Sequence, residues 1–159
     1  MKIIFGLGWA EIRQKNSSKI FKESSAGELF AKYADRIGHD YAFEVLPMPF
    51  DVLIKQSGAI WICEREKTCL PAGRKVMMLS SEDLAVRFQK VCDSGAKSST
   101  IWIGGPNGLT PEQMNQIQPH LIWSFGPMTL PHELASVVAA EQIYRAISIL
   151  KNHPYHSSH

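Results

Sequence analysis

Short apolar runs alternate with helical stretches along this chain, and this alternation constrains its fold more than any other feature. The helical stretches have apolar residues at helical spacing near 29–37, 84–92 and 131–150, and a shorter one is expected at 110–118. The runs typical of buried strands are Lys2–Leu7, Tyr41–Leu46, Ala59–Cys63, Thr100–Ile103 and His120–Ser124. Strands connected through helices usually pair in parallel. We therefore predict an α/β fold with a mostly parallel sheet covered by helices on both faces.

Helix-capping signals support this order of elements. Ser25 and Glu28 have capping-box spacing before the first helix. Ser80 precedes the second helical stretch, and Thr110 with Pro111 provides an N-cap followed by proline at the first helical position. The short helix is therefore expected to begin directly after a glycine-rich segment.

Two predicted strands end in loops rich in glycine and proline. Thr100–Ile103 is followed by GGPNG at 104–108, and the strand ending at Ser124 is followed by FGPMTLP at 125–131. Glycine lets the backbone approach a ligand closely, and proline stiffens a loop. Ligands of parallel α/β folds lie beyond the carboxyl ends of strands, so the two loops suit a planar heterocycle. No Gly-Lys-Ser/Thr follows for a triphosphate, and no acidic residue lies about 20 positions on for a dinucleotide ribose. Two ordinary tight turns remain the alternative.

Composition bounds the class of protein. A length of 159 residues suggests one domain, 1–159, and no apolar stretch reaches membrane-spanning length. The N-terminal segment soon turns charged, so we expect no signal peptide. The three cysteines show no zinc-like pairing, which favours reduced thiols in the cytosol. A net charge of +2 permits an RNA partner without requiring one.

The last predicted helix and the tail carry further candidate residues. Apolar residues surround most of the helix, which indicates burial by the sheet and by a partner subunit. Glu141 and Arg145 are four residues apart, and from the residues alone a surface or interface salt bridge is favoured over catalysis. The tail places histidines at 153, 156 and 159, but Pro154 interrupts them and no carboxylate is near, so no metal site is expected. An aromatic, cationic tail that contacts RNA or packs into a site is favoured.

The segments IGGPNGLTPEQ and WSFGPMTLPHELASVVAAEQIYRAISILKNHPYH closely resemble the ribosomal RNA large subunit methyltransferase H family. The resemblance is dense from about Ile101 to His156 and looser at Ala59–Cys63 and Leu79–Ala85. Members of this family are SPOUT-superfamily enzymes that methylate N3 of a pseudouridine in helix 69 of 23S rRNA. The resemblance implies a single SPOUT domain with a deep trefoil knot in its C-terminal half, S-adenosylmethionine as cofactor, and a cytoplasmic homodimer that acts on the large-subunit rRNA of the ribosome, with no membrane and no metal.

The resemblance also implies roles for individual residues. The substrate-handling or catalytic positions would be His132, Glu141, Arg145, Tyr155 and His156. The tail is expected to reach towards the cofactor of the partner, and the dimer to pack through the last helix. The cofactor-binding positions would be Ile62, Gly104, Gly105, Gly126, Pro127, Met128, Thr129, Leu130 and Pro131.

The first half of the chain departs from the family. The segment 50–58 is shorter than the usual charged helix, 68–78 contains extra sequence, and 14–25 is unlike the family. These changes affect the expected RNA-facing surface more than the cofactor pocket. Two alternatives therefore stay open: a knotted RNA-binding protein without catalysis, and a SPOUT methyltransferase acting on another RNA such as tRNA.

Overall fold

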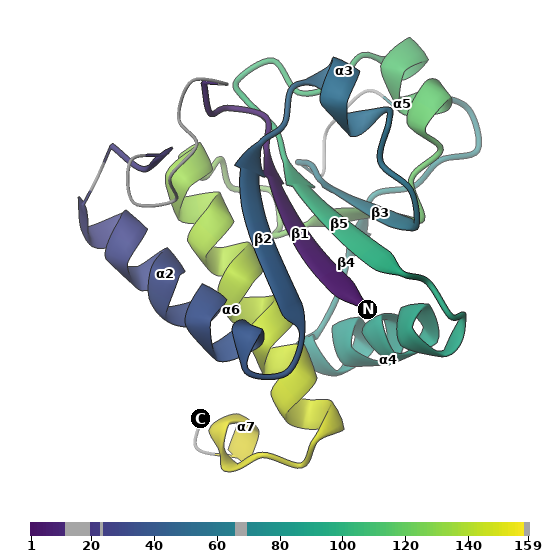
Figure 1. Cartoon of the computed structure of the whole chain (residues 1–159). Coiled ribbons are helices and arrows are strands. Elements are labelled where there is room, and N and C mark those ends of the chain that lie inside the picture. Colours follow the sequence, from purple (N-terminus) through teal and green to yellow (C-terminus); the bar gives the residue numbers. More distant parts are fainter. Residues whose placement is uncertain (12–19, 23, 66–69, 158–159) are drawn as a thin grey trace.

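The strands form one parallel sheet, as predicted. The computed structural model describes residues 1–11, 20–22, 24–65 and 70–157, apart from the side chains at 24, 156 and 157. Within that part the strand order is β2-β1-β5-β3-β6-β4, and every pairing is parallel (Figure 1). The strands are β1 Lys2–Leu7, β2 Ala42–Pro47, β3 Ala59–Cys63, β4 Met77–Met78, β5 Ser98–Ile103 and β6 Leu121–Ser124.

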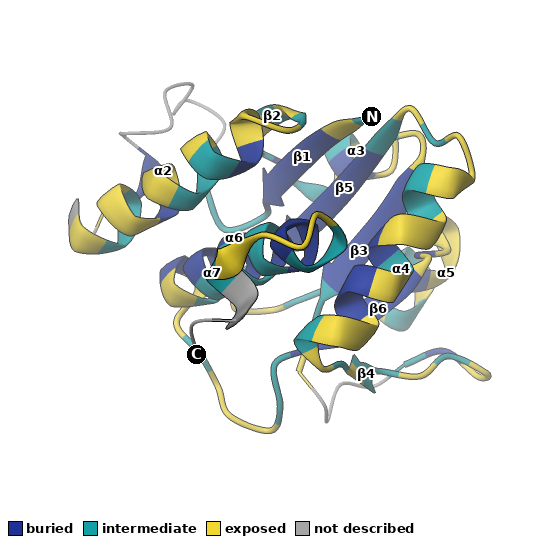
Figure 2. Ribbon diagram, turned by 90° about the horizontal axis from the view of Figure 1, so that it is seen from below, coloured by how far each residue is buried: buried dark blue, intermediate teal, exposed yellow. Residues whose placement is uncertain are grey.

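Helices cover both faces of this sheet, which confirms the predicted layers. The longer helices α2, α4 and α6 pack on one face, and the short helices α3 and α5 contribute buried residues on the other. In Figure 2 the strands β1, β5 and β3 are buried, while the helices turn their exposed residues outward. The helices are α2 Ser24–Gly38, α3 Phe50–Leu53, α4 Ser81–Asp93, α5 Pro111–Ile117, α6 His132–Leu150 and α7 Pro154–Ser157.

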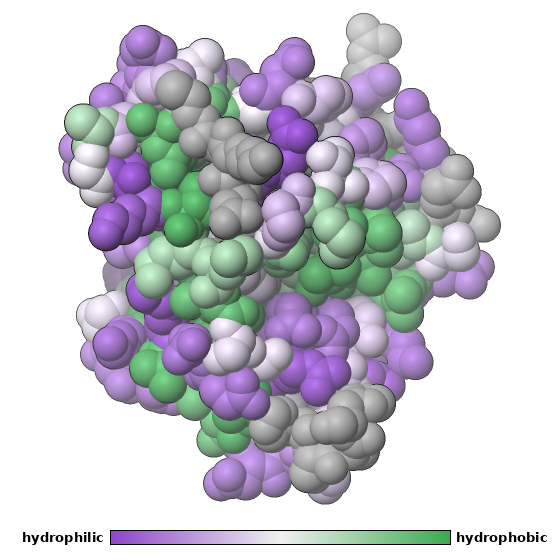
Figure 3. Space-filling view, turned by 180° about the vertical axis from the view of Figure 1, so that it is seen from behind, coloured by the Kyte–Doolittle hydropathy of each residue, from purple (hydrophilic) through white to green (hydrophobic). Residues whose placement is uncertain are grey.

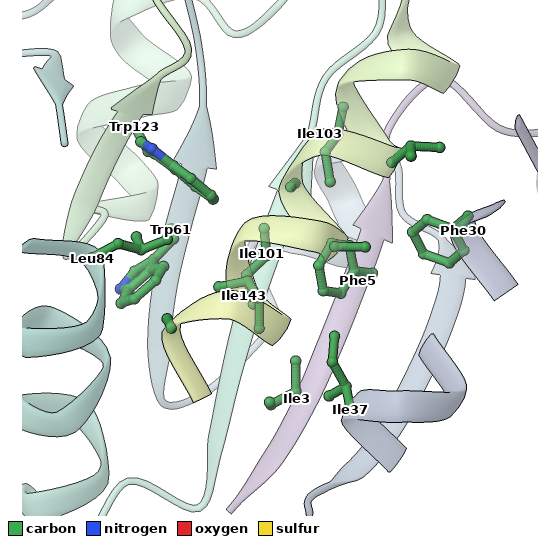
Figure 4. Packing of buried hydrophobic residues seen from close by; sticks show 14 of the residues in the cluster. Ile3, Phe5, Phe30, Ile37, Trp61, Leu84, Ile101, Ile103, Trp123 and Ile143 are labelled. Carbon is green, nitrogen blue, oxygen red and sulfur yellow. The ribbon is translucent and has the colours of Figure 1, made fainter. Parts of the chain in front are cut away.

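Strand alternation divides the core into two clusters. In β3, Trp61 packs with the cluster under the longer helices, whereas Ile60 and Ile62 belong to the cluster under α3 and α5. Figure 4 shows Trp61 beside Leu84 of α4. Full burial of each large apolar side chain stabilises the fold by about 1.5–3 kcal/mol. The sheet is thus held from both sides.

The local signals were mostly, but not entirely, correct. Ser80 Oγ accepts the N–H of Asp83 at 3.0 Å at the start of α4. Thr110 is the N-cap of α5, as predicted, and it forms a capping box with Gln113. The first helix instead begins at Ser24, so Ser25 lies within its first turn and is not the cap. The elements β4, α3 and α7 were not predicted, because two to four residues are too few to show a period.

This arrangement brings four strand ends together. Because β1, β5, β3 and β6 are parallel neighbours, their carboxyl ends open at one edge of the sheet. The segments 14–25 and 68–78, which depart from the family, lie partly outside the described residues. The trefoil knot stays a prediction.

Candidate functional site

A cavity of about 610 Å³ lies where the chain leaves β3, β5 and β6. Small-molecule sites in proteins have volumes of roughly 300–1,000 Å³, and this cavity lies within that range. The two glycine-proline loops form most of its wall, so the cavity is lined largely by backbone and apolar side chains. The lining residues are Cys63, Glu64, Arg65, Ile103 to Leu109, Pro111, Phe125, Gly126, Met128 to His132 and Ala135.

The first loop, 104–109, is held close to its neighbours. Gly108 N–H donates to the carbonyl of Gly105 at 3.1 Å, and Gly108 has a positive φ of 58°. A Cβ on Gly108 would lie 3.0 Å from Glu64 Oε2, and one on Gly105 would lie 3.6 Å from Trp9 Cα. Glycine is therefore favoured at 108, where φ is positive and the loop passes Glu64, whereas a Cβ at 105 would make only ordinary contact with the turn after β1. The capped helix α5 then fixes the far end of the loop.

The second loop, 125–131, turns back towards α6. Gly126 has a φ of 107°, and its N–H donates to Ser124 Oγ at 3.0 Å. Arg65 Nη1 donates to Thr129 Oγ1 at 3.1 Å, which ties this loop to the exit of β3. Met128 is 69% exposed at the rim. The two loops thus face each other across the cavity.

Most of the expected cofactor positions lie at this cavity, and two do not. Gly104, Gly105, Gly126 and the residues from Met128 to Pro131 line it. Ile62 is fully buried in the core under α3 and α5, and the next residue, Cys63, reaches the cavity instead. Pro127 is exposed and is not part of the lining.

The exit of β3 adds side chains that the sequence did not single out. Glu64 and Arg65 both line the cavity, next to Cys63. Burial, with a smaller contribution from the nearby charge of Glu64, raises the pKa of the Cys63 thiol well above its usual value. Cys63 is therefore a neutral wall residue and not a thiolate nucleophile.

His132 borders the cavity at the start of α6. Its ring stacks on Trp9 with a centroid distance of 4.6 Å and an angle of 26°. Trp9 Nε1 donates to Ser136 Oγ at 3.1 Å, and that hydroxyl donates to the carbonyl of His132 at 2.8 Å. The turn after β1 thus supports the histidine. Trp9 was not singled out from the sequence, although its place two residues after a predicted strand could have indicated a position at the same edge of the sheet.

Glu141, Arg145 and Tyr155 meet in a separate cluster, named here the α6–α7 cluster. Glu141 Oε1 accepts from Arg145 Nε at 2.9 Å, from Arg145 Nη2 at 2.7 Å and from the Tyr155 hydroxyl at 3.0 Å. The Arg145 guanidinium also lies 4.9 Å from the centre of the Tyr155 ring. Tyr33 of α2 completes the cluster, with its hydroxyl 3.4 Å from that of Tyr155.

The cluster changes the acidity of its own members. Burial raises the pKa of Tyr155 well above its usual value, aided by the hydroxyl of Tyr33 and the charge of Glu141. Burial lowers the pKa of Arg145, but the hydrogen bonds and charge of Glu141 outweigh this effect and raise it. Tyr155 therefore stays protonated at neutral pH, and it acts as a donor. The predicted position His156 has a side chain outside the described part.

The cavity and the α6–α7 cluster lie apart on one chain. His132 and Arg145 are thirteen positions apart on α6, and at 1.5 Å per residue this places them about 20 Å apart along the axis. The structure therefore brings His132 to the cavity, and it brings Glu141, Arg145 and Tyr155 to the other end of the same helix.

Two other kinds of feature are absent from the described residues. No group of three metal-ligating side chains occurs among the described residues. None of the helices in the described part has the length and apolar character of a membrane span.

Comparison with known proteins places the chain in a family. A family model described as a predicted SPOUT methyltransferase matches residues 18–156. Ribosomal RNA large subunit methyltransferase H of Stenotrophomonas maltophilia is 36% identical over 138 residues, which cover 80% of this chain and 86% of that protein. The protein of the same name from Thioalkalivibrio sulfidiphilus is 33% identical over similar shares, 80% and 86%. That of Methylocella silvestris is 46% identical over 79 residues, 50% of this chain and 48% of that protein. The chain belongs to the ribosomal RNA large subunit methyltransferase H family of SPOUT methyltransferases.

Proposed function

We propose that this chain, acting as a single SPOUT domain, methylates N3 of a pseudouridine in helix 69 of 23S rRNA with S-adenosylmethionine as the methyl donor. The observation that carries the proposal is the backbone-lined cavity at the ends of β3, β5 and β6, in a chain of this family. Its relatives are named for acting on large-subunit ribosomal RNA. Such a substrate implies a cytoplasmic site of action.

The residues present fit the proposed cofactor. Apolar side chains of Ile103, Leu109 and Leu130 line the cavity and suit the faces of an adenine. The glycines of both loops allow backbone groups to approach its edge. Glu64 Oε2 is buried without a hydrogen-bond partner among the described residues, so the cavity wall holds an acceptor for a ligand donor.

The bound cofactor supplies a sulfonium methyl group, which passes to N3 while the N3 proton leaves and a neutral thioether remains. The chain contributes mainly by alignment, which accounts for several orders of magnitude in rate. His132 borders the cavity and is held by Trp9, so it is placed to orient the base or take up its proton.

We propose that the enzyme is a homodimer whose site is completed across the two chains. The α6–α7 cluster lies about 20 Å along α6 from His132, too far to act on the same base within one chain. Packing of α6 against its symmetry mate would bring Arg145, Tyr155 and His156 of one protomer to the cavity of the other. Arg145 would then stabilise the negative charge that develops on the base. Hydrophobic surface is visible on the face opposite to that of Figure 1, where it is interrupted by hydrophilic residues (Figure 3).

Two experiments test the cofactor and the target. Calorimetry with S-adenosylmethionine should give saturable binding, and no binding at millimolar cofactor would favour an RNA-binding protein without catalysis. Mass spectrometry of 23S rRNA from a deletion strain should show loss of N3-methylpseudouridine. Retention of that nucleoside, with loss of a methyl group from tRNA, would assign the enzyme to another RNA.

Mixed dimers test the composite site. Gly126→Val strains the positive φ of the second loop, and Arg145→Gln removes the charge of the cluster. Each variant alone should be inactive. Co-expressed, they should recover about a quarter of wild-type activity, because half of the dimers are mixed and each mixed dimer has one intact site. Activity that stays at the level of the separate variants contradicts a site shared between chains.

A further inference from the structure

Glu64 is the only acidic residue among the described residues that line the cavity, and its carboxylate is poorly satisfied. Oε1 accepts only a long hydrogen bond, 3.3 Å, from the N–H of Arg65. Oε2 is buried and has no hydrogen-bond partner among the described residues. None of the described salt bridges includes this carboxylate. Buried polar atoms in native proteins are nearly always paired, so this oxygen at a cavity wall is a candidate acceptor for a ligand.

The position of Glu64 limits what that group can be. Oε2 packs against the first loop, 3.0 Å from where a Cβ on Gly108 would lie. Rotation of a carboxylate about its last torsion is soft, so this oxygen can turn into the cavity at little cost. An ionised carboxylate only accepts hydrogen bonds, so its partner on the ligand has to be a donor.

We propose that Glu64 accepts hydrogen bonds from the 2′- and 3′-hydroxyls of the cofactor ribose, and thereby selects a ribonucleoside. The inference rests on the proposed function, since it assigns a group within the same pocket. A vicinal diol presents two adjacent O–H donors, which match the two oxygens of one carboxylate. The apolar residues Ile103 and Leu109 flank the first loop, so the adenine would lie against them, on the wall next to Glu64.

The amino group of the methionine moiety is the other donor in this cofactor, and the surroundings of Glu64 disfavour it. Arg65 follows directly in the chain and reaches across to Thr129 at 3.1 Å. Since Arg65 also lines the cavity, an ammonium at Glu64 would share the cavity with a guanidinium of like charge. A neutral diol carries no such repulsion.

Calorimetry with three nucleosides separates these donors. S-adenosylhomocysteine has both the diol and the amino group, 5′-methylthioadenosine has the diol alone, and its 2′-deoxy analogue has a broken diol. Glu64→Gln should weaken binding of the first two ligands equally, by about 10- to 100-fold, the range for a charge-assisted hydrogen bond. The 2′-deoxy analogue should bind wild-type protein more weakly than 5′-methylthioadenosine. It should also lose less affinity in the variant than the other two ligands, because only its 3′-hydroxyl can still donate to Glu64. Glu28→Gln, which removes an exposed carboxylate from α2 outside the cavity lining, should leave all three affinities unchanged.

Urea unfolding of the ligand-free proteins adds a readout independent of activity. Since Glu64 Oε2 has no hydrogen-bond partner within the part of the chain that the structure describes, Glu64→Gln should unfold at the same urea concentration as wild type or at a higher one. A loss confined to S-adenosylhomocysteine would assign Glu64 to the amino group and overturn the proposal. Unchanged affinities, with or without a loss of stability, would also overturn it while the proposed function stands. A wild-type protein that binds none of the nucleosides would instead overturn the proposed function, and this inference with it.

Discussion

The ion pair between Glu141 and Arg145 in the α6–α7 cluster should contribute strongly to the stability of the fold. Glu141 and Arg145 are substituted separately and together, as Glu141→Gln and Arg145→Gln. Their side chains are only 17% and 16% exposed, and two of the three donors to Glu141 Oε1 come from Arg145. Removing either residue leaves the other charge without its partner in a largely buried place.

The expected coupling follows from that burial. Exposed pairs four residues apart contribute about 0.3–0.5 kcal/mol, whereas breaking a fully buried pair costs about 3–5 kcal/mol. A pair that is largely but not fully buried should give a coupling energy of about 2 kcal/mol. At a pH that keeps the His39 ring protonated, Asp35 and His39 provide the matched control, because they lie four residues apart at 3.8 Å and are 80% and 76% exposed.

Urea unfolding measures this double-mutant cycle. All four proteins are compared at one fixed concentration, because the stability of a dimer depends on concentration. The coupling energy is the part of the double-variant change that the two single changes do not explain. A value below about 0.5 kcal/mol, equal to that of the Asp35–His39 control, would show that water screens the Glu141–Arg145 pair as well. The reasoning from burial would then be refuted.

Three other changes test separate parts of the structure. The free energy of unfolding should fall as pH rises above about 9. Burial raises the pKa of Cys63, and that of Tyr41 to about 12, so the native state keeps protons that the unfolded chain loses. Urea unfolding at pH 8 and 11 measures this fall, and Cys63→Ala should make the fall smaller. Gly58→Ala should destabilise the fold by more than about 2 kcal/mol, and Gly73→Ala by about 1 kcal/mol. Both glycines have positive φ, but only a Cβ on Gly58 would collide with a carbonyl oxygen, at 2.2 Å. Equal losses of stability would contradict the steric argument. Trp9→Phe should lower the stability of the fold by about 1 kcal/mol because the hydrogen bond is lost, and Trp9→Ala by about 3 kcal/mol because the ring is lost as well. Thermal unfolding measures both losses, and equal values would contradict this prediction.

The backbone of the site was predictable from the sequence, and most of its charged wall was not. Both glycine-proline loops line the cavity, because a parallel sheet brings the ends of its strands to one edge. The N-cap at Thr110 is a local signal, and it formed as expected. Glu64 and Arg65 were missed since charged residues after a strand are typical of any solvated loop.

The expected position of Ile62 shows a different limit. Side chains alternate along a strand, so two successive residues face opposite sides of the sheet. Ile62 therefore packs under α3 and α5, and the cavity is reached one residue later, at Cys63. Family resemblance places a motif along the chain, but a contact made through the backbone does not require the side chain to point at the ligand.

The turn after β1 is a structural part of the site although it precedes the segment that the family model matches. That model begins at residue 18, whereas Trp9 stacks on His132 and its Cα lies 3.6 Å from where a Cβ on Gly105 would be. The exit of β1 thus contacts both the first loop and the start of α6. The N-terminal turn therefore lies against both the wall of the cavity and the histidine that borders it.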